Sequence, residues 1–272
     1  MPSPPSPEPD RGPDAPGTIT VLNANVGNGF APDARLVQAV VASGADLVAL
    51  EELNARQAAT VSAALQDRYP HQATFGDSYE GKGLFSRWPL AGAVQLHLIA
   101  GRPDVRATLT LGQQEVTIIL AHPRPPKVRR EGIVFDRQSV RQVLGLGSLA
   151  LASAPAIMMG DFNMSPRHPI YRRFLGAGLI DAVAARGDDI GMATFPIRFG
   201  DAWQRGMPVR RLRVPPVMRF DYIWHTPEFV TEHAWIGPDT GSDHLPVMAR
   251  LRLLPIPGDP DEGEDQDIPA RT

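Results

Sequence analysis

Short apolar runs alternate with amphipathic patterns along most of this chain. Residues 18–26, TITVLNANV, predict a buried strand, and residues 31–44 then carry apolar side chains at helical spacing up to Gly44. Residues 45–53, ADLVALEEL, predict a second buried strand that ends in two acids. The same reasoning predicts helices over residues 55–68 and 135–153, and strands over residues 83–87, 91–98, 104–111, 115–121, 154–160, 219–225, 229–236 and 246–253.

The order of these elements indicates the fold class. Strands follow one another in runs, and helices separate only some of them. An all-parallel doubly wound sheet needs a helix after nearly every strand, so that architecture fits poorly. The pattern therefore predicts an α/β protein with two packed β-sheets flanked by helices. No internal repeat is visible by eye.

Composition separates the two ends from the body. Residues 1–16 are rich in Pro and residues 255–272 in Asp, Glu and Pro, so neither holds enough apolar surface to offset the entropy of ordering. We expect one folded domain, residues 17–254, between two disordered ends. This body holds 25 of the 27 Lys and Arg residues and 21 of the 30 Asp and Glu residues. Its net charge is therefore +4, against −3 for the whole chain, which favours an anionic substrate.

Several classes of protein are excluded by what the sequence lacks. No run approaches the roughly 18 apolar residues of a membrane span, and the first 17 residues lack the apolar core of a signal peptide. The absence of cysteine excludes disulfides, thiolate catalysis and cysteine-bound zinc. There is no H-x-x-x-H or H-x-H spacing and no G-x-x-x-x-G-K-[ST], which argues against a zinc hydrolase and a nucleotide kinase. We expect a chain that is soluble as given. Its compartment and its oligomeric state stay open, since a leader or an anchor could have been removed.

Polar side chains recur where the predicted strands end. In MMGDFNMSP, Asp161 and Asn163 follow an apolar run, and residues two apart in an extended segment point to the same side. An isolated acid after a strand is usually a turn residue or helix cap, and an isolated His is usually structural. Together these residue types suit metal-assisted hydrolysis, since they include carboxylates, two histidines and amide donors. The other members are Asn25, Glu51, Glu52, His122, Asp221, Asp243 and His244.

Seven segments in this order resemble the endonuclease/exonuclease/phosphatase superfamily: NANV, LVALEEL, GLFSRWPL, IILAHP, MMGDFN, FDYIWH and GSDHLPV. That superfamily includes deoxyribonucleases, apurinic endonucleases, inositol polyphosphate 5-phosphatases and neutral sphingomyelinases. The resemblance runs from about residue 18 to residue 253. It implies a four-layered α/β sandwich of two mixed β-sheets flanked by helices, and hydrolysis of phosphate esters by attack of an activated water on phosphorus.

The resemblance also implies a divalent-metal site. Glu52 matches the family's metal-binding Glu, Asn25 matches an Asn that helps to hold metal and phosphate, and Asp243 matches a further acid near the metal. The expected cofactor is Mg²⁺, which suits a few protein oxygens and several waters, with Mn²⁺ or Ca²⁺ as alternatives. Glu51 stands where the family usually has Gln. It is either an outward-facing strand residue or an additional acid near the metal.

Catalytic roles follow from the same resemblance. Asp221 and His244 match a pair in which the carboxylate fixes the imidazole tautomer and stabilises its charge. Asp161 would orient or deprotonate the attacking water, and Asn163 would donate to the phosphate. His122 matches a second His of the deoxyribonucleases, a candidate general acid for the leaving oxygen. Other members of the superfamily carry a different residue there.

Several arginines near the candidate site indicate which substrate it could bind. The segment HPRPPKVRR places Arg124, Arg129 and Arg130 just beyond His122, and Arg106 lies in the preceding strand. Such cations suit a phosphate backbone. The segment 195–219 adds six arginines, with Phe195, Phe199 and Trp203 among them as candidates for base stacking. Only two of the 27 basic residues are Lys, however, so a general bias toward Arg, with pairing to surface acids, is the alternative.

The predicted function is a divalent-metal-dependent nuclease whose partner is nucleic acid, with DNA favoured over RNA. The alternatives are a phosphomonoesterase or a phospholipid- or sphingomyelin-type phosphodiesterase on the same fold, because loops and not the catalytic set decide the substrate. A catalytically inactive binding module is disfavoured, since every core position of the family set is occupied.

Overall fold

The computed structural model describes residues 17–129, 132–186, 192–198 and 213–255. The two ends that were predicted to be disordered therefore lie outside the described residues, apart from residue 255. No helix in the described part is long and apolar enough to cross a membrane.

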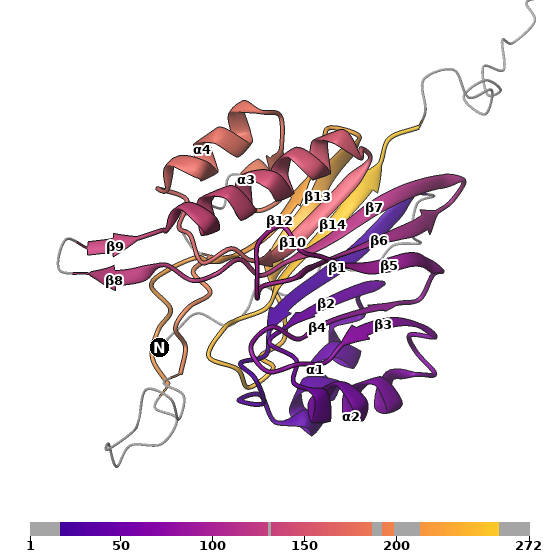
Figure 1. The fold of residues 1–272 in the computed structure, drawn as a ribbon. Coiled ribbons are helices and arrows are strands. Elements are labelled where there is room, and N and C mark those ends of the chain that lie inside the picture. The colour runs from indigo at the N-terminus through magenta and orange to yellow at the C-terminus, as the bar shows by residue number, and fades with distance from the viewer. Residues whose placement is uncertain (1–16, 130–131, 187–191, 199–212, 256–272) are drawn as a thin grey trace, which may run out of the picture.

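Two six-stranded β-sheets face each other (Figure 1). The first has the order β13 (Phe229–Ile236), β14 (Val247–Leu253), β1 (Thr18–Asn25), β2 (Leu47–Glu51), β4 (Lys82–Ser86) and β3 (His71–Phe75). The second has the order β11 (Ile180–Asp181), β12 (Asp221–His225), β10 (Ala156–Asp161), β7 (Gln114–Ala121), β6 (Asp104–Leu111) and β5 (Leu90–Leu96).

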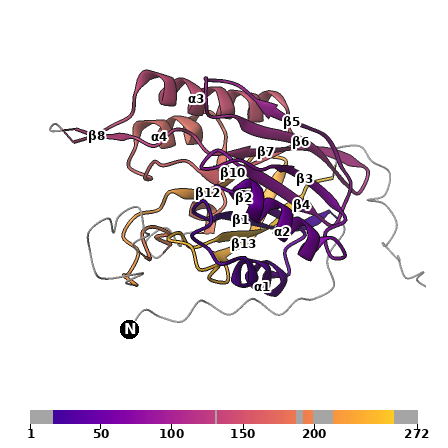
Figure 2. The same cartoon turned by 60° about the horizontal axis from the view of Figure 1, so that its bottom comes forward.

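Helices cover the outer face of each sheet, which gives four layers. Figures 1 and 2 show α1 (Asp33–Ser43) and α2 (Ala55–Leu65) on one side, and α3 (Arg137–Ala152) and α4 (Pro169–Gly176) on the other. The predicted sandwich of two mixed sheets flanked by helices is confirmed. A short 3₁₀ helix (Ala184–Arg186) and a hairpin of β8 (Lys127–Arg129) and β9 (Gly132–Val134) complete the described elements, and the hairpin projects from the body (Figure 1).

Alternating apolar residues hold the layers together. Side chains such as Ile19 and Val21 of β1 pack between the sheets against Ile118 of β7, whereas their sequence neighbour Leu22 packs outward under α1 and α2. Strands that are buried on both faces read as continuous apolar runs, which is why β1, β2 and β10 could be predicted closely. Local signals set the helix ends, since the Asn54 side chain accepts the Gln57 N–H at 2.9 Å at the start of α2.

Strand direction brings the candidate residues to one end of the sandwich. β1 and β2 are parallel, as are β7 and β10, and the other neighbouring strands are antiparallel. In the first sheet, the carboxyl ends of β1 and β2 therefore lie at the same end of the sheet as the start of β14. In the second sheet, the carboxyl ends of β7 and β10 lie at the same end as the start of β12. Asn25 is opposite Glu51 in the first sheet, and Asp161 is opposite Asp221 in the second.

Candidate active site

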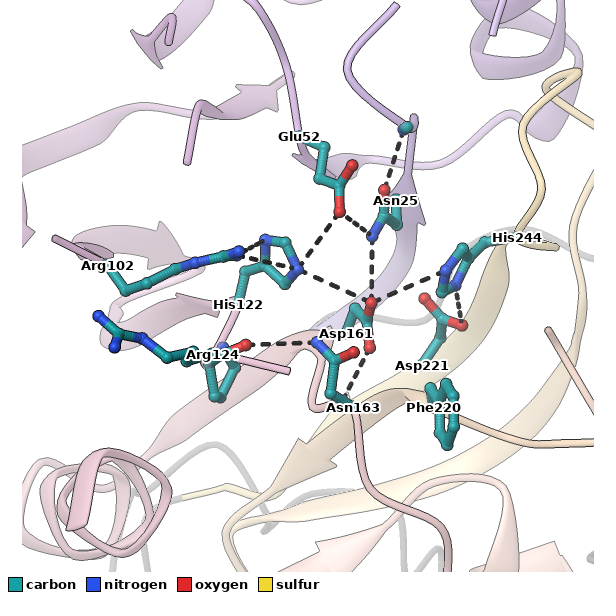
Figure 3. A network of polar contacts seen from close by, with 12 residues as sticks. Asn25, Glu52, Arg102, His122, Arg124, Asp161, Asn163, Phe220, Asp221 and His244 are labelled. Atoms are coloured by element: carbon teal, nitrogen blue, oxygen red, sulfur yellow. Dashed lines mark hydrogen bonds and ion pairs between the residues drawn. The ribbon is translucent and has the colours of Figure 1, made fainter. Parts of the chain in front are cut away.

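Six strand ends, three from each sheet, meet at one polar cluster (Figure 3). From the first sheet come Asn25 and Glu52, with His244 in the loop before β14; from the second come His122, Asp161 and Asp221. The expectation that these residues share one site agrees with this geometry.

Asp161 is the centre of the cluster. Its Oδ2 accepts from Asn25 Nδ2 at 3.1 Å, and the Nε2 atoms of His122 and His244 each lie 3.8 Å from the same oxygen. The strand can bring Asp161 here because residue 160 is Gly: a Cβ at that position would lie 1.8 Å from the carbonyl oxygen of Ala121. Burial, partly offset by His244, raises the pKa of Asp161 to about 7.

Asp221 and His244 form the expected pair. Nδ1 of His244 lies 3.0 Å from Oδ2 of Asp221, both residues are buried, and the ring of Phe195 packs 4.5 Å from the imidazole. Burial alone would lower the pKa of His244, but the carboxylates of Asp221 and Asp161 raise it well above its usual value. The imidazole therefore carries a positive charge and keeps an N–H on Nε2, the atom nearer to Asp161.

His122 has the opposite environment. Burial lowers the pKa of His122 well below its usual value, and the cations of Lys82 and Arg102 lower it further. The Arg102 guanidinium lies against the ring, with Nη1 3.2 Å from Nδ1, and Nε2 of the ring is 3.6 Å from Oε1 of Glu52. In the free protein His122 is thus a neutral imidazole, so a role as proton donor requires a phosphate that raises its pKa again.

Arg102, Asp104 and Gln142 are site residues that the sequence did not reveal. Oδ1 of Asp104 accepts the His122 backbone N–H at 3.0 Å, and its Oδ2 accepts from Gln142 at 2.8 Å. The Gln142 amide also donates to the carbonyl of Arg102 at 3.1 Å. This buried network fixes His122 and Arg102, and nothing in local spacing could have indicated it, because its members come from a loop, a strand and a helix.

Asn163 reaches the cluster by a different route from the one predicted. The expectation rested on an extended segment, but Asn163 has a φ of 53°, so the rule of alternating sides does not apply. Its backbone N–H donates to Oδ1 of Asp161 at 2.8 Å, and its Nδ2 donates to the carbonyl of Pro123 at 3.3 Å. The side chain lies beside Asp161 in Figure 3.

The acids of the first sheet suit a divalent cation. Glu52 is turned into the site by a left-handed φ of 54°, and its side chain is 16% exposed. Burial raises the pKa of Glu52, as does the nearby carboxylate of Asp243, while Asn25 lowers it. Asn25 donates to Glu52 at 3.2 Å, and its oxygen accepts the Gly27 N–H at 3.0 Å. That oxygen keeps a second lone pair, so the role of Asn25 beside the metal stays a prediction.

No three His, Asp or Glu side chains of the described residues close around one point as a ready-made metal cage. Mg²⁺ needs no such cage, because it keeps most of its water and uses one or two carboxylates. Glu52 and Asp243 supply two carboxylates of this kind, close enough to affect each other's charge.

Glu51 is not an outward-facing strand residue. It is fully buried, and neither carboxylate oxygen has a hydrogen-bond partner among the described residues. Burial raises its pKa well above the usual value, and the carboxylates of Asp221 and Asp161 raise it further. Glu51 thus lies among the acids of the site, as an additional acid.

The predicted substrate arginines have different positions. Arg124 lies next to the cluster (Figure 3), although one of its N–H groups donates to the carbonyl of Ala100 at 3.2 Å. Arg106 lies on β6 beside Ile119, and no described contact joins it to the cluster. Arg129 ends β8 and its side chain is not described, while Arg130 lies outside the described residues, together with Phe199 and Trp203.

Three arginines of the segment 195–219 pair with acids, as the alternative interpretation proposed. Arg198 binds Asp239, Arg213 lies 3.9 Å from the same carboxylate, and Arg219 binds Asp181 at 2.6 Å. Arg198 and Arg219 are buried, so neither of these two guanidinium groups is available to a phosphate chain.

Comparison with known proteins gives the same family that the sequence motifs resemble. The model of the Endonuclease/Exonuclease/phosphatase family matches residues 22–244. No curated protein sequence matches the chain.

Similar solved structures include an endonuclease/exonuclease/phosphatase from Beutenbergia cavernae, with a TM-score of 0.65 and 19% identity over 87% of this chain and 72% of that one. D. rerio TDP2 complexed with single-strand DNA product has a TM-score of 0.59 and 17% identity over 86% of this chain and 99% of that one. Sphingomyelinase C from Streptomyces griseocarneus has a TM-score of 0.54 and 18% identity over 86% and 99%. At these identities the likeness concerns the fold.

Proposed function

Because this chain belongs to the endonuclease/exonuclease/phosphatase family, we propose that it is a divalent-metal-dependent phosphodiesterase that hydrolyses nucleic acid, with DNA preferred over RNA. The observation that carries the proposal is the arrangement around Asp161. A carboxylate with a pKa of about 7 lies between a charged His244 and a neutral His122, beside the amide donor of Asn25.

Each of these groups has a task in attack by water on phosphorus. Asp161 orients the water and accepts its proton, since its pKa is close to neutral pH. The Nε2–H of His244, held by Asp221, donates to a phosphate oxygen as negative charge builds, and Asn163 supplies an amide donor for the same charge. Arg102 binds a further phosphate oxygen through its guanidinium, and the approach of that phosphate lets His122 take up a proton for the leaving oxygen.

Glu52 and Asp243 would hold the metal ion, which supplies positive charge to the phosphate when bound. Asn25 then orients Glu52 and Asp161 through one amide group, because its Nδ2 donates to both carboxylates. The carbonyl of Glu52 also accepts the Asn28 N–H at 2.9 Å, which helps to hold the left-handed backbone that aims this side chain.

Cations near His122 support a nucleic-acid substrate. Arg102 and Arg124 lie on one side of the cluster (Figure 3), and Lys127 follows at the start of the β8–β9 hairpin. The positive charge of residues 17–254 has the sign that a phosphate backbone requires. The structural likeness to TDP2 complexed with a DNA product supports the same choice.

A phospholipid-type phosphodiesterase is the second candidate, because the fold also resembles a sphingomyelinase C. The cluster around Asp161 would act on a lipid phosphodiester by the same chemistry. The loops around it decide which molecule enters.

A substrate panel tests the proposal. The purified protein is assayed with Mg²⁺ on supercoiled plasmid, single-stranded DNA, RNA, an abasic duplex, inositol phosphates and sphingomyelin. We expect strand cleavage of DNA that stops in excess chelator. Cleavage of sphingomyelin or an inositol phosphate, with DNA and RNA left intact, would replace the nuclease assignment by the alternative.

A further inference from the structure

The loop that carries Asp243 and His244 is tied to a segment distant in sequence. The N–H of Ile197 donates to the carbonyl of Asp243 at 2.8 Å, and the N–H of Leu245 donates to the carbonyl of Thr194 at 2.9 Å. These two bonds flank His244 on both sides. Residues 194–197 thus act as a short backbone splint beside the imidazole.

A buried arginine, Arg198, follows the splint directly. Arg198 is 8% exposed, and its Nη1 donates to the carbonyl of Ser242 at 2.7 Å and to Oδ1 of Asp239 at 2.9 Å. Its Nη2 donates to Oδ2 of Asp239. A bidentate pair of this kind fixes the direction of both side chains, since the guanidinium is planar and its donors are spaced to match a carboxylate.

Asp239 is bound from a third element as well. Arg35 of α1 donates from Nη2 to Oδ2 of Asp239 at 2.8 Å and from Nε to its carbonyl at 3.1 Å. Oδ1 of Asp239 also accepts the Gly241 N–H at 2.8 Å. We call Arg35, Arg198 and Asp239 the Asp239 clasp. It joins α1, the splint and the loop before β14.

Contacts lead from the clasp to the site through Ser242. Arg198 holds the Ser242 carbonyl, while the hydroxyl of Ser242 donates to Oδ1 of Asp243 at 3.2 Å and accepts the His244 N–H at 3.3 Å. Ser242 is fully buried, so its polar atoms are held by protein groups and not by solvent. Gly241 permits the turn before it with a φ of 91°, where a Cβ would lie 2.8 Å from Cδ of Pro32.

We propose that Arg198 is a positioning residue of the active site, which holds Ser242 through the Asp239 clasp so that Asp243 and His244 keep their places relative to Asp161. The inference rests on the proposed phosphodiesterase function. Arg198 itself touches neither carboxylate nor imidazole of the cluster in any described contact. It acts through the loop, and this explains why an arginine in a basic segment is buried against an acid and not turned to the substrate.

The test compares Arg198→Met, Arg198→Lys and the control Arg252→Met. Arg252 also pairs with a carboxylate, Glu232 at 3.1 Å, but lies on β14 at the end of the sandwich away from the site. With Mg²⁺ and a small chromogenic phosphodiester, Arg198→Met should lower kcat by about 100-fold with KM little changed, since small displacements in a site cost about that much. Arg198→Lys, which keeps the charge but not the two-pronged geometry, should lose less, and Arg252→Met should match the wild type.

Two further measurements separate positioning from general destabilisation. In a His244→Ala background Arg198→Met should cost clearly less than about 100-fold, because the part of its effect that acts through His244 is already lost and only the part that acts through Asp243 remains. In metal-free protein the imidazole signals of His244, assigned by their loss in His244→Ala, should shift in Arg198→Met and Arg198→Lys and stay in place in Arg252→Met.

Unchanged His244 signals in both Arg198 variants, or losses that multiply with His244→Ala, would overturn the inference. If the wild type cleaves no phosphodiester, the proposed function fails, and the His244 signals still decide whether Arg198 positions the ring. If Arg198→Met does not fold, the folded Arg198→Lys variant carries the test through both readouts.

Discussion

Two adjacent glutamates of this site have opposite environments. Glu51 ends β2 with its carboxyl group fully buried and without a hydrogen-bond partner among the described residues. Glu52 leaves the strand with a left-handed φ, reaches solvent in part and accepts from Asn25. The left-handed backbone at Glu52 therefore makes this acid a candidate metal ligand, whereas Glu51 stays buried in the protein interior.

Glu51 should make folding stability depend on pH. Its pKa in the folded protein is raised well above the ordinary value of 4.5, so the folded state keeps a proton that the unfolded chain releases. The free energy of unfolding should thus fall as pH rises above about 4.5, until the folded carboxyl group itself ionises. Glu51→Gln, which stays neutral, should be as stable as the wild type near pH 4 and more stable near pH 8 in urea unfolding experiments.

The matched control is Glu115→Gln, an exposed glutamate at the start of β7. It should leave the pH dependence of stability as it is in the wild type. Equal pH dependence in Glu51→Gln and the wild type would mean that the buried carboxyl group is ionised in both states.

The Asp221–His244 pair should behave as one unit in kinetics. If Asp221 acts by holding the charged imidazole, His244→Ala should lower kcat by about 100-fold or more, and Asp221→Asn should add little to that variant. Rates of DNA cleavage by both single variants and the double variant give the comparison. Losses that multiply would show that Asp221 acts apart from His244, and a loss of stability alone would make the His structural.

Sequence reasoning found the members of the site that end buried strands, because an apolar run followed by a polar residue is a strong local signal. It missed Arg102, which lies in a loop after β5 and becomes part of the site only through its contact with His122. Lys82 was also missed, since a cation just before the strand predicted over residues 83–87 gives no sign that it will be buried near a histidine.

At the scale of elements, the ends of the buried strands were predicted within two residues, as were those of the half-buried β5, whereas β3, α4 and β11 were missed. β3, HQATF, has intermediate or exposed side chains throughout, so it shows no alternation. α4 has eight residues and buries only Ile170, Tyr171 and Phe174, which is too short for a helical period to stand out. The two-residue β11 depends on pairing with β12, which no local pattern encodes.

The segment from Arg124 through the β8–β9 hairpin should set affinity for DNA. If Arg124, Arg129 and Arg130 follow the phosphate backbone, their joint replacement by Ala should raise KM on duplex DNA. It should also flatten the dependence of log affinity on log salt by about 0.9 for each phosphate that the variant no longer neutralises. Turnover of a small chromogenic phosphodiester should change little, because that substrate does not need the hairpin.

Arg68→Ala is the control, since Arg68 is exposed beyond the carboxyl end of α2, away from the site. It should leave both KM and the salt slope unchanged. Normal hydrolysis of DNA by the triple variant, with the wild-type salt slope, would mean that these arginines do not track the backbone.

At the scale of the whole molecule, the two sheets repeat one arrangement. Each has a central parallel pair, β1 with β2 and β7 with β10, and two antiparallel neighbours on either side. This similarity is not visible as a sequence repeat. Two sheets can share an order of strands when their apolar and polar positions are similar, even if the residues at those positions differ. The carboxyl ends of the two parallel pairs supply Asn25 and Glu52 from one sheet and His122 and Asp161 from the other, so neither sheet alone contains the site.

The most direct test of this account is the initial rate of plasmid DNA cleavage as a function of Mg²⁺ concentration. It is measured for the wild type, for Glu52→Gln from the first sheet and for Asp161→Asn from the second. We predict that the wild type requires Mg²⁺ and that each folded variant loses most of its activity. High Mg²⁺ or Mn²⁺ should restore part of the activity of Glu52→Gln alone, because only that variant weakens metal binding. Full wild-type activity in excess chelator, or an undiminished rate in either variant, would contradict a metal-dependent site built jointly by the two sheets.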